Sequence, residues 1–327
     1  MKAIELRDGL VSIGICAFNE EANIGTILKA ILRQKFSFPT ETIVVSDGST
    51  DATESIVQEI ASKNPSVRLI RHAAQKGKSQ VLNTIFRECR GKIVITIAAD
   101  TQIQDGSIGQ MVEALNLPAV GICWARPVPI LPARGLVERL GYLGFRLHDR
   151  FYRALNSTGE VKHSTGEFVA YRREAFTRIP VECVNDDAYL AIQAARKGFK
   201  IQYLTETTTG TSLPRTLLDY IQQRRRWVYG HFQVGSLLGE YSSVIEFSLS
   251  KRPMLVASVV LEEIRDRPVE LPVLLASLLV EFAVVVLALR DVVLHVKHAP
   301  WKVVRYQKPL AVSDPEIAQA KAVNELS

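Results

Sequence analysis

The chain lacks the signatures of several common protein classes. Neither G-x-G-x-x-G nor G-x-x-x-x-G-K-[ST] occurs after a predicted strand, which argues against a dinucleotide-dependent oxidoreductase and a P-loop kinase. No stretch interleaves basic and aromatic residues as RNA-binding motifs do, so no nucleic-acid partner is expected. Cysteine is scarce and shows no C-x-x-C spacing, which favours buried reduced thiols over a disulfide framework or zinc site. The four cysteines are Cys16, Cys89, Cys123 and Cys183.

The first nine residues also lack an apolar segment, so no cleaved secretory signal is expected and the catalytic part should stay in the cytoplasm. In 327 residues, hydrophobic types make up 47% and charged types 23%, which indicates a globular chain with a full core. The net charge of +6 is mild. It favours anionic small ligands or an anionic membrane surface, and a solvated basic surface is the plain alternative.

Strand and helix patterns alternate over the first hundred residues. Strands are expected at 11–16, 42–45, 67–71 and 92–97, and helices at 21–33, 51–63 and 78–90. This alternation predicts a doubly wound, mainly parallel sheet. Ligands of such sheets bind beyond the carboxyl ends of the strands. Because Asn19, Asp47 and Asp100 each follow a strand, we expect them to converge at one edge.

Seven short stretches occur in a fixed order: 18–21, 46–51, 76–78 with Asn83, 98–100, 166–167 with 171–173, 185–190 and 223–227. By these stretches the chain resembles inverting glycosyltransferases of the GT-A fold. It is similar to their large second family, which includes cellulose, chitin and hyaluronan synthases and polyprenyl-phosphate sugar transferases. The resemblance implies an α/β GT-A nucleotide-diphospho-sugar transferase domain at 8–230. A C-terminal helical, membrane-associated region would follow at 231–327.

The resemblance also implies which side chains bind the donor. Asn19, Glu21 and Asp47 would surround the nucleotide, with Asp47 accepting a hydrogen bond from the base or ribose. Lys76 and Lys78 would approach the diphosphate, where a glycine between them lets the backbone come close.

Asp100 is the implied ligand of a divalent cation, Mg²⁺ or Mn²⁺, which would bridge both phosphates and neutralise the leaving group. A solvated loop carboxylate is the alternative for this residue. Relatives usually carry aspartate where this chain has Ala98, so one acid of an Asp-x-Asp pair is missing. Either metal affinity is lowered, another ligand substitutes, or the chain is a catalytically silent nucleotide-binding scaffold subunit.

Asp187 is the candidate general base, which would take the proton of the acceptor hydroxyl. Asp186 beside it would raise one pKa of the pair by like-charge repulsion. The alternative is that the pair only caps a helix at 188–197. By resemblance, Gly166 and Glu167 belong to the acceptor site.

In a helix, Gln223, Arg226 and Trp227 share one face. The resemblance implies that Gln223 and Arg226 hold the donor diphosphate and that Trp227 floors the acceptor site, because an indole stacks on a sugar ring. This motif is typical of members that extend polysaccharides, which leaves processive action open, and of some that glycosylate lipids. Alternatively, residues 224–226 form a basic surface facing lipid headgroups.

Residues 271–289 form an apolar run long enough to span a bilayer core of about 30 Å. Glu281 near its centre would cost roughly 3 kcal/mol unless it faces protein, in a bundle or a dimer. A buried helix of a soluble protein is the alternative. Four basic residues oppose a single crossing, and a re-entrant helix, a second crossing at 254–261 or an interfacial position would resolve the conflict. They are Lys297, Lys302, Arg305 and Lys308.

The sequence therefore predicts a metal-dependent inverting glycosyltransferase at the cell membrane, with its catalytic domain on the cytoplasmic side. It would transfer a sugar from a nucleotide-diphosphate donor, UDP-linked, to a glycan or lipid acceptor. A polyprenyl-phosphate sugar transferase and the silent scaffold stay open as alternatives. Homo-oligomerisation also stays open.

Overall fold

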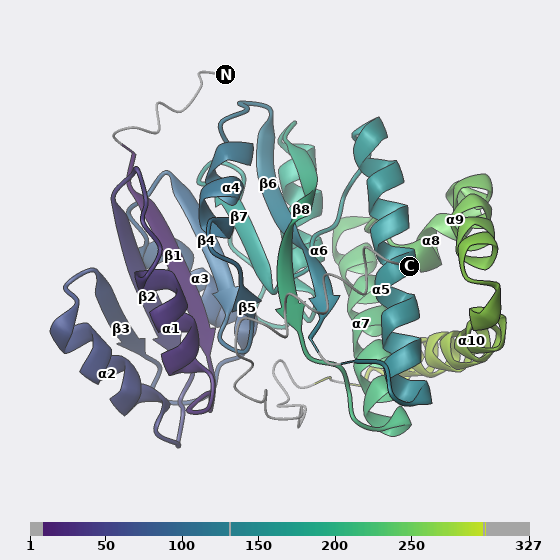
Figure 1. Ribbon diagram of the computed structural model, residues 1–327, viewed down its shortest axis with the longest axis horizontal. Helices are drawn as coiled ribbons and strands as arrows, with labels where there is room; N and C mark the ends of the chain where they lie inside the picture. Colours follow the sequence, from purple (N-terminus) through teal and green to yellow (C-terminus); the bar gives the residue numbers. More distant parts are fainter. Residues whose placement is uncertain (1–8, 131, 297, 299–327) are drawn as a thin grey trace.

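The computed structural model describes residues 9–130, 132–296 and 298. In this part of the chain, eight strands form one mixed sheet in the order β3-β2-β1-β4-β7-β6-β8-β5 (Figure 1). The first four strands in this order run parallel, whereas β7 is antiparallel to both of its neighbours. The strands are β1 (Val11–Ala17), β2 (Thr40–Ser46), β3 (Val67–Arg71), β4 (Ile93–Ala98), β5 (Gln102–Ile103), β6 (Val120–Pro129), β7 (Phe168–Arg172) and β8 (Lys200–Thr211).

The predicted alternation of the N-terminal half is confirmed. Each predicted strand overlaps an observed one. A continuous apolar run is typical of a strand that is buried on both faces of a sheet, and β1 is buried along its whole length. Three helices provide the crossovers: α1 (Ile24–Leu32), α2 (Thr53–Lys63) and α3 (Lys78–Glu88). In the second half β6 and β8 also pair parallel, whereas β7 and β5 run antiparallel to their neighbours, so the expectation of a mainly parallel sheet is confirmed for the described strands.

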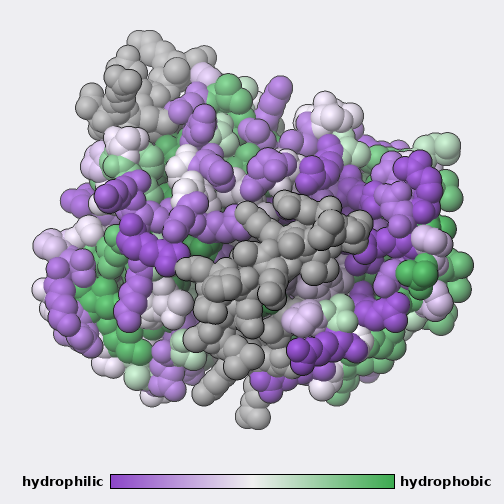
Figure 2. Space-filling view, viewed as in Figure 1, coloured by the Kyte–Doolittle hydropathy of each residue, from purple (hydrophilic) through white to green (hydrophobic). Residues whose placement is uncertain are grey.

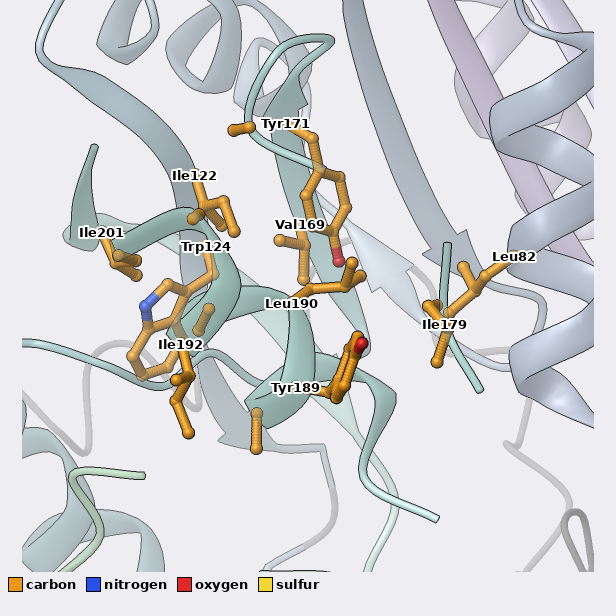
Figure 3. Packing of buried hydrophobic residues seen from close by; sticks show 14 of the residues in the cluster. Leu82, Ile122, Trp124, Val169, Tyr171, Ile179, Tyr189, Leu190, Ile192 and Ile201 are labelled. Atoms are coloured by element: carbon orange, nitrogen blue, oxygen red, sulfur yellow. The ribbon is translucent and has the colours of Figure 1, made fainter. Parts of the chain in front are cut away.

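The second half places a large aromatic core beneath β6 and β7. Trp124, Tyr171 and Leu190 pack there between the sheet and α6, with other buried side chains around them (Figure 3). Its helices are α4 (Ser107–Ala114), α5 (Leu136–Thr158) and α6 (Asp186–Arg196). All four cysteines are free and buried, as predicted.

The C-terminal helices pack against α5 and α7 rather than forming a separate body. They follow α7 (Leu217–Leu238) and are α8 (Ile245–Lys251), α9 (Pro253–Asp266), the short 3₁₀ turn η2 (Pro268–Glu270) and α10 (Leu271–Val293). The predicted division at residue 230 falls inside α7. Helix α10 packs chiefly on α7 and also contacts α5 (Figure 1).

Helix α10 keeps one face on the protein and exposes the other. Between 271 and 289 every exposed residue is apolar, including Leu279 at 74% and Phe282 at 72% exposure. Figure 2 shows hydrophobic side chains along the right-hand edge, over α9 and α10. By length and composition alone, residues 268–293 could cross a membrane.

The structure bears on one of the alternatives for the membrane segment, and the residues of another observation are not described. The predicted second crossing at 254–261 lies in α9, whose 14 residues span about 21 Å and are too short. The basic residues expected after the apolar run, Lys297, Lys302, Arg305 and Lys308, lie outside the described residues.

Candidate active site

The loops that follow β1 and β2 are joined by side chains predicted to bind the nucleotide. The backbone N–H of Thr50 donates to Asn19 Oδ1 at 2.8 Å, and that of Ala52 donates to Glu21 Oε2 at 3.0 Å. Asn19 has φ +54°, a left-handed conformation that asparagine tolerates better than most residues. In this structure Asn19 and Glu21 therefore hold together the two loops at the carboxyl ends of β1 and β2.

Asp47 has a different contact from the one predicted. Its carboxylate is fully buried and accepts hydrogen bonds from the backbone N–H groups of Lys76 at 3.0 Å and Gly77 at 2.8 Å. His72 Nδ1 lies 2.7 Å from the same carboxylate. Both oxygens of Asp47 thus hold the loop before α3 in this structure, and its hydrogen bond to base or ribose stays a prediction. Sequence reasoning missed His72, which had no motif to mark it.

That loop delivers Lys78 to the site, while the Lys76 side chain is exposed. Gly77, with φ +92°, provides the turn that starts α3. Lys78 Nζ lies 3.3 Å from Asp186 Oδ2. Burial lowers the pKa of Lys78, but the carboxylates of Asp186 and Asp187 raise it by more, so this cation stays charged.

Asp187 is the second residue of α6, with one oxygen bound and the other facing the site. Its Oδ1 accepts from the N–H of the next residue, Ala188, at 2.6 Å. The N-cap of α6 is Asn185, and no side chain caps this helix, so the helix-capping alternative is not supported. Burial, followed by repulsion from Asp186, raises the pKa of Asp187 to about 7. The predicted like-charge effect is therefore present, although burial is the larger cause.

Gly166 allows three groups to meet. A Cβ atom built on Gly166 would lie 2.4 Å from Lys78 Nζ and 3.3 Å from Asp187 Oδ2. The next residue, Glu167, accepts the Ala98 N–H on its backbone oxygen at 2.9 Å, which places this loop against the end of β4. Burial raises the pKa of Glu167. Its Oε2 is buried and has no hydrogen-bond partner among the described residues.

Asp100 lies within a group of interacting carboxylates. Burial raises its pKa, and burial followed by repulsion from Asp100 raises the pKa of Glu20 to about 7. Glu20 was not singled out from the sequence. In the described part of the chain, no group of three or more His, Cys, Asp or Glu side chains could hold a metal alone. An ion held by Asp100 would need phosphate oxygens and water as its other ligands, as Mg²⁺ sites commonly have.

Helix α7 is attached directly to the turn that carries the aspartate pair. Asn185 Nδ2 donates to the Trp227 carbonyl at 2.9 Å. A Cβ atom on Gly230 would lie 2.3 Å from Asn185 Oδ1, so glycine is needed for this close approach. Gln223, Arg226 and Trp227 follow on this helix at the predicted helical spacing.

Arg224 and Arg225 do not contribute to the headgroup-facing basic surface that was the alternative for residues 224–226. Arg224 Nε donates to Glu281 at 2.8 Å, and Arg225 Nε donates to Asp291 at 2.6 Å. Both arginines are therefore paired with carboxylates of α10. The contact with Arg224 also accounts for Glu281 in the middle of an apolar helix. Its charge faces the protein, where it is paired, as its cost in a membrane would require.

A buried histidine and aromatic cluster fills the space between β6, α5 and α7. His163 stacks on Tyr152 with ring centroids 5.5 Å apart and lies 5.4 Å from His231. Burial lowers the pKa of His163 from 6.5 to about 3 and those of His148 and His231 well below their ordinary value. This packing gives His148 and His163 a structural role.

We expect this cluster to make the protein acid-labile. In the unfolded chain these histidines bind protons below about pH 6.5, whereas in the folded chain they stay neutral to a lower pH. The free energy of unfolding should therefore fall as pH drops below about 6.5. The slope is at most about 1.4 kcal/mol per pH unit per histidine. Urea unfolding at several pH values would measure it. His163→Phe should flatten the slope and His295→Asn, at an exposed histidine, should not; equal slopes in all three proteins would contradict the account.

The site and sheet together define a GT-A glycosyltransferase fold. A mannosyltransferase from Pyrobaculum calidifontis, solved with GDP-Man and Mn²⁺, superposes with a TM-score of 0.58 at 21% identity. The match covers 97% of this chain and 79% of that one.

Residues 8–230 match the family model described as "Glycosyltransferase like family 2". The chain therefore belongs to this family of enzymes. An N-acetylglucosaminyltransferase of Bradyrhizobium diazoefficiens is 24% identical over 68% of this chain, and a beta-monoglucosyldiacylglycerol synthase of a Nostoc species is 27% identical over 68%. The chain spans about half the length of these curated relatives, 49% of each.

Proposed function

We propose that this protein is an inverting glycosyltransferase that moves a sugar from a nucleotide-diphosphate donor, UDP-linked, to a glycan or lipid acceptor. The observation that carries the proposal is the Asp187 carboxylate, with a pKa raised to about 7 and one oxygen near Lys78 and Gly166. A base with a pKa near the working pH is well suited to removing a hydroxyl proton. The name of the first curated relative supports the transfer of a sugar, and the name of the second supports a lipid acceptor.

The proposed step is a single displacement. Asp187 takes the proton of the acceptor hydroxyl, and that oxygen forms a bond to the anomeric carbon. The bond from this carbon to the donor phosphate oxygen breaks, and its electron pair leaves with the nucleoside diphosphate. Lys78, already close to Asp186, and Arg226 would bind the departing phosphates.

The residues present fit a divalent cation. Carboxylate oxygens are its preferred ligands, Asp100 is partly exposed, and a buried oxygen of the neighbouring Glu167 has no partner in the described chain. Asp100 would hold Mg²⁺ or Mn²⁺, which when bound neutralises charge on the leaving diphosphate. The Mn²⁺ in the Pyrobaculum structure supports a divalent cation in an enzyme of this fold.

Ala98 favours one rival, the silent scaffold, and also provides a test. If the missing acid only weakens a working site, Ala98→Asp should tighten Mn²⁺ binding about tenfold, because it restores a hard oxygen two residues from Asp100. Titration calorimetry with Mn²⁺ and UDP would measure the change. Tighter metal binding without turnover, in a parent that is also inactive, would support the scaffold. Unchanged affinity would count against Asp100 as the ligand.

We also propose that the apolar face of α10 meets the cytoplasmic surface of the cell membrane. Its exposed residues are all apolar from 271 to 289, and its single charge in that range points into the protein.

The deciding experiment for the enzymatic function is a donor assay of the full chain with UDP-, GDP- and dTDP-sugars, with and without Mn²⁺. Release of UDP that requires metal supports the enzyme. A polyprenyl-phosphate transferase would instead need only lipid phosphate as acceptor and tolerate loss of Trp227.

A further inference from the structure

A charged residue in the middle of α10 is connected to the motif helix α7. Arg224 Nε and Nη2 donate to the two oxygens of Glu281 at 2.8 and 3.0 Å, a two-pronged contact that fixes the guanidinium plane. Arg224 also donates to Glu246 of α8. Two carboxylates from separate helices therefore orient this one cation.

The same guanidinium covers the indole of Trp227. Its central carbon lies 5.5 Å from the ring centroid, within the range of a cation–π interaction. The two residues are three positions apart on α7, where side chains of a helix are neighbours. The Trp227 backbone is held independently by Asn185 at 2.9 Å. Asn185 thus holds the backbone of Trp227, whereas Arg224 lies over its ring.

We propose that Glu281 is a positioning residue of the acceptor site, which fixes Arg224 and, through Arg224, the plane of Trp227. The inference rests on the proposed function, in which Trp227 floors that site. It accounts for a carboxylate placed among apolar residues, where an unpaired charge would be costly. It also couples the packing of α10 to the part of the site that binds the acceptor.

Indole fluorescence tests the coupling without turnover. The chain has three tryptophans, Trp124, Trp227 and Trp301. In a Trp301→Phe background, acrylamide quenching reports mainly Trp227, because Trp124 is fully buried. Glu281→Gln should raise the quenching constant about twofold or more as the ring loses its oriented cation. Asp291→Asn is the matched control, because it breaks the other ion pair between α7 and α10 but does not involve the cation over Trp227.

Transfer kinetics provide the second readout. Glu281→Gln should raise the acceptor KM several-fold, while UDP affinity and metal-dependent donor hydrolysis stay near those of the parent. Unchanged quenching, or an equal change in Asp291→Asn, would overturn the proposal. If Glu281→Gln does not fold, Arg224→Lys keeps the charge without the two-pronged contact and should give the same result. Absence of turnover with every donor would refute the proposed function and leave the quenching result readable.

Discussion

Asp187→Asn should abolish sugar transfer while leaving nucleotide affinity nearly intact. The amide keeps the shape of the side chain but does not take a proton, so we expect a rate loss of about 10²-fold or more. UDP affinity, measured by calorimetry, should stay within about threefold of the parent, because this carboxylate faces the acceptor side of the proposed step. Transfer near the parental rate would show that another group is the base.

The pH profile sharpens this prediction. Because the base must be ionised, kcat/KM of the parent should rise with pH through about 7, the raised pKa of Asp187. Asp186→Asn removes the like charge that helps to raise this pKa, so the rise should move to lower pH. If the rise of kcat/KM occurs at the same pH in Asp186→Asn as in the parent, the ionisation that controls the rate does not belong to Asp187.

Asp100→Ala should remove the metal dependence of donor binding. Its carboxylate is the proposed protein ligand, and no other set of described side chains could hold the ion alone. We expect the enhancement of UDP affinity by Mn²⁺ to disappear and the transfer rate to fall about 10²-fold or more.

Asp105→Asn is the control for that variant. Asp105 follows Asp100 closely in the sequence, but it is exposed, and its Oδ1 lies 3.1 Å from Arg33 Nη2. It should retain parental metal dependence, since a surface ion pair of this kind contributes little. Metal-dependent UDP binding that persists in Asp100→Ala would refute the metal role.

The N-terminal half of the fold could be predicted because its strands are continuous apolar runs. Buried parallel strands have this pattern, and turn residues separate each from the next helix. The strands of the second half were not predicted, since β6, β7 and β8 pair antiparallel or with register shifts that local pattern does not encode. Their partners are set by long-range packing around Trp124.

The candidate site was predicted in part for a similar reason. Motifs located Asp187, Lys78 and Gly166, which the structure brings together. They did not predict the contacts that Asp47 makes within the chain, because the sequence does not show that the amides of residues 76 and 77 bind its carboxylate.

The partners from distant segments had no signal in the sequence. Glu20 lies one residue from a position that was chosen, yet only the fold shows that the charge of Asp100 helps to raise its pKa. Arg224 was part of a basic run, and its pairing with Glu281, 57 positions away, depends on how α10 crosses α7.

The most direct test of the account is the stereochemistry of the product. The full chain would be incubated with an α-linked UDP-sugar, Mn²⁺ and the acceptor found in the donor assay, and the anomeric proton of the first product followed by NMR. Attack by an oxygen that Asp187 deprotonates predicts a β-linked product that is absent in Asp187→Asn. An α-linked product, or no product from any donor that the protein binds, would contradict it.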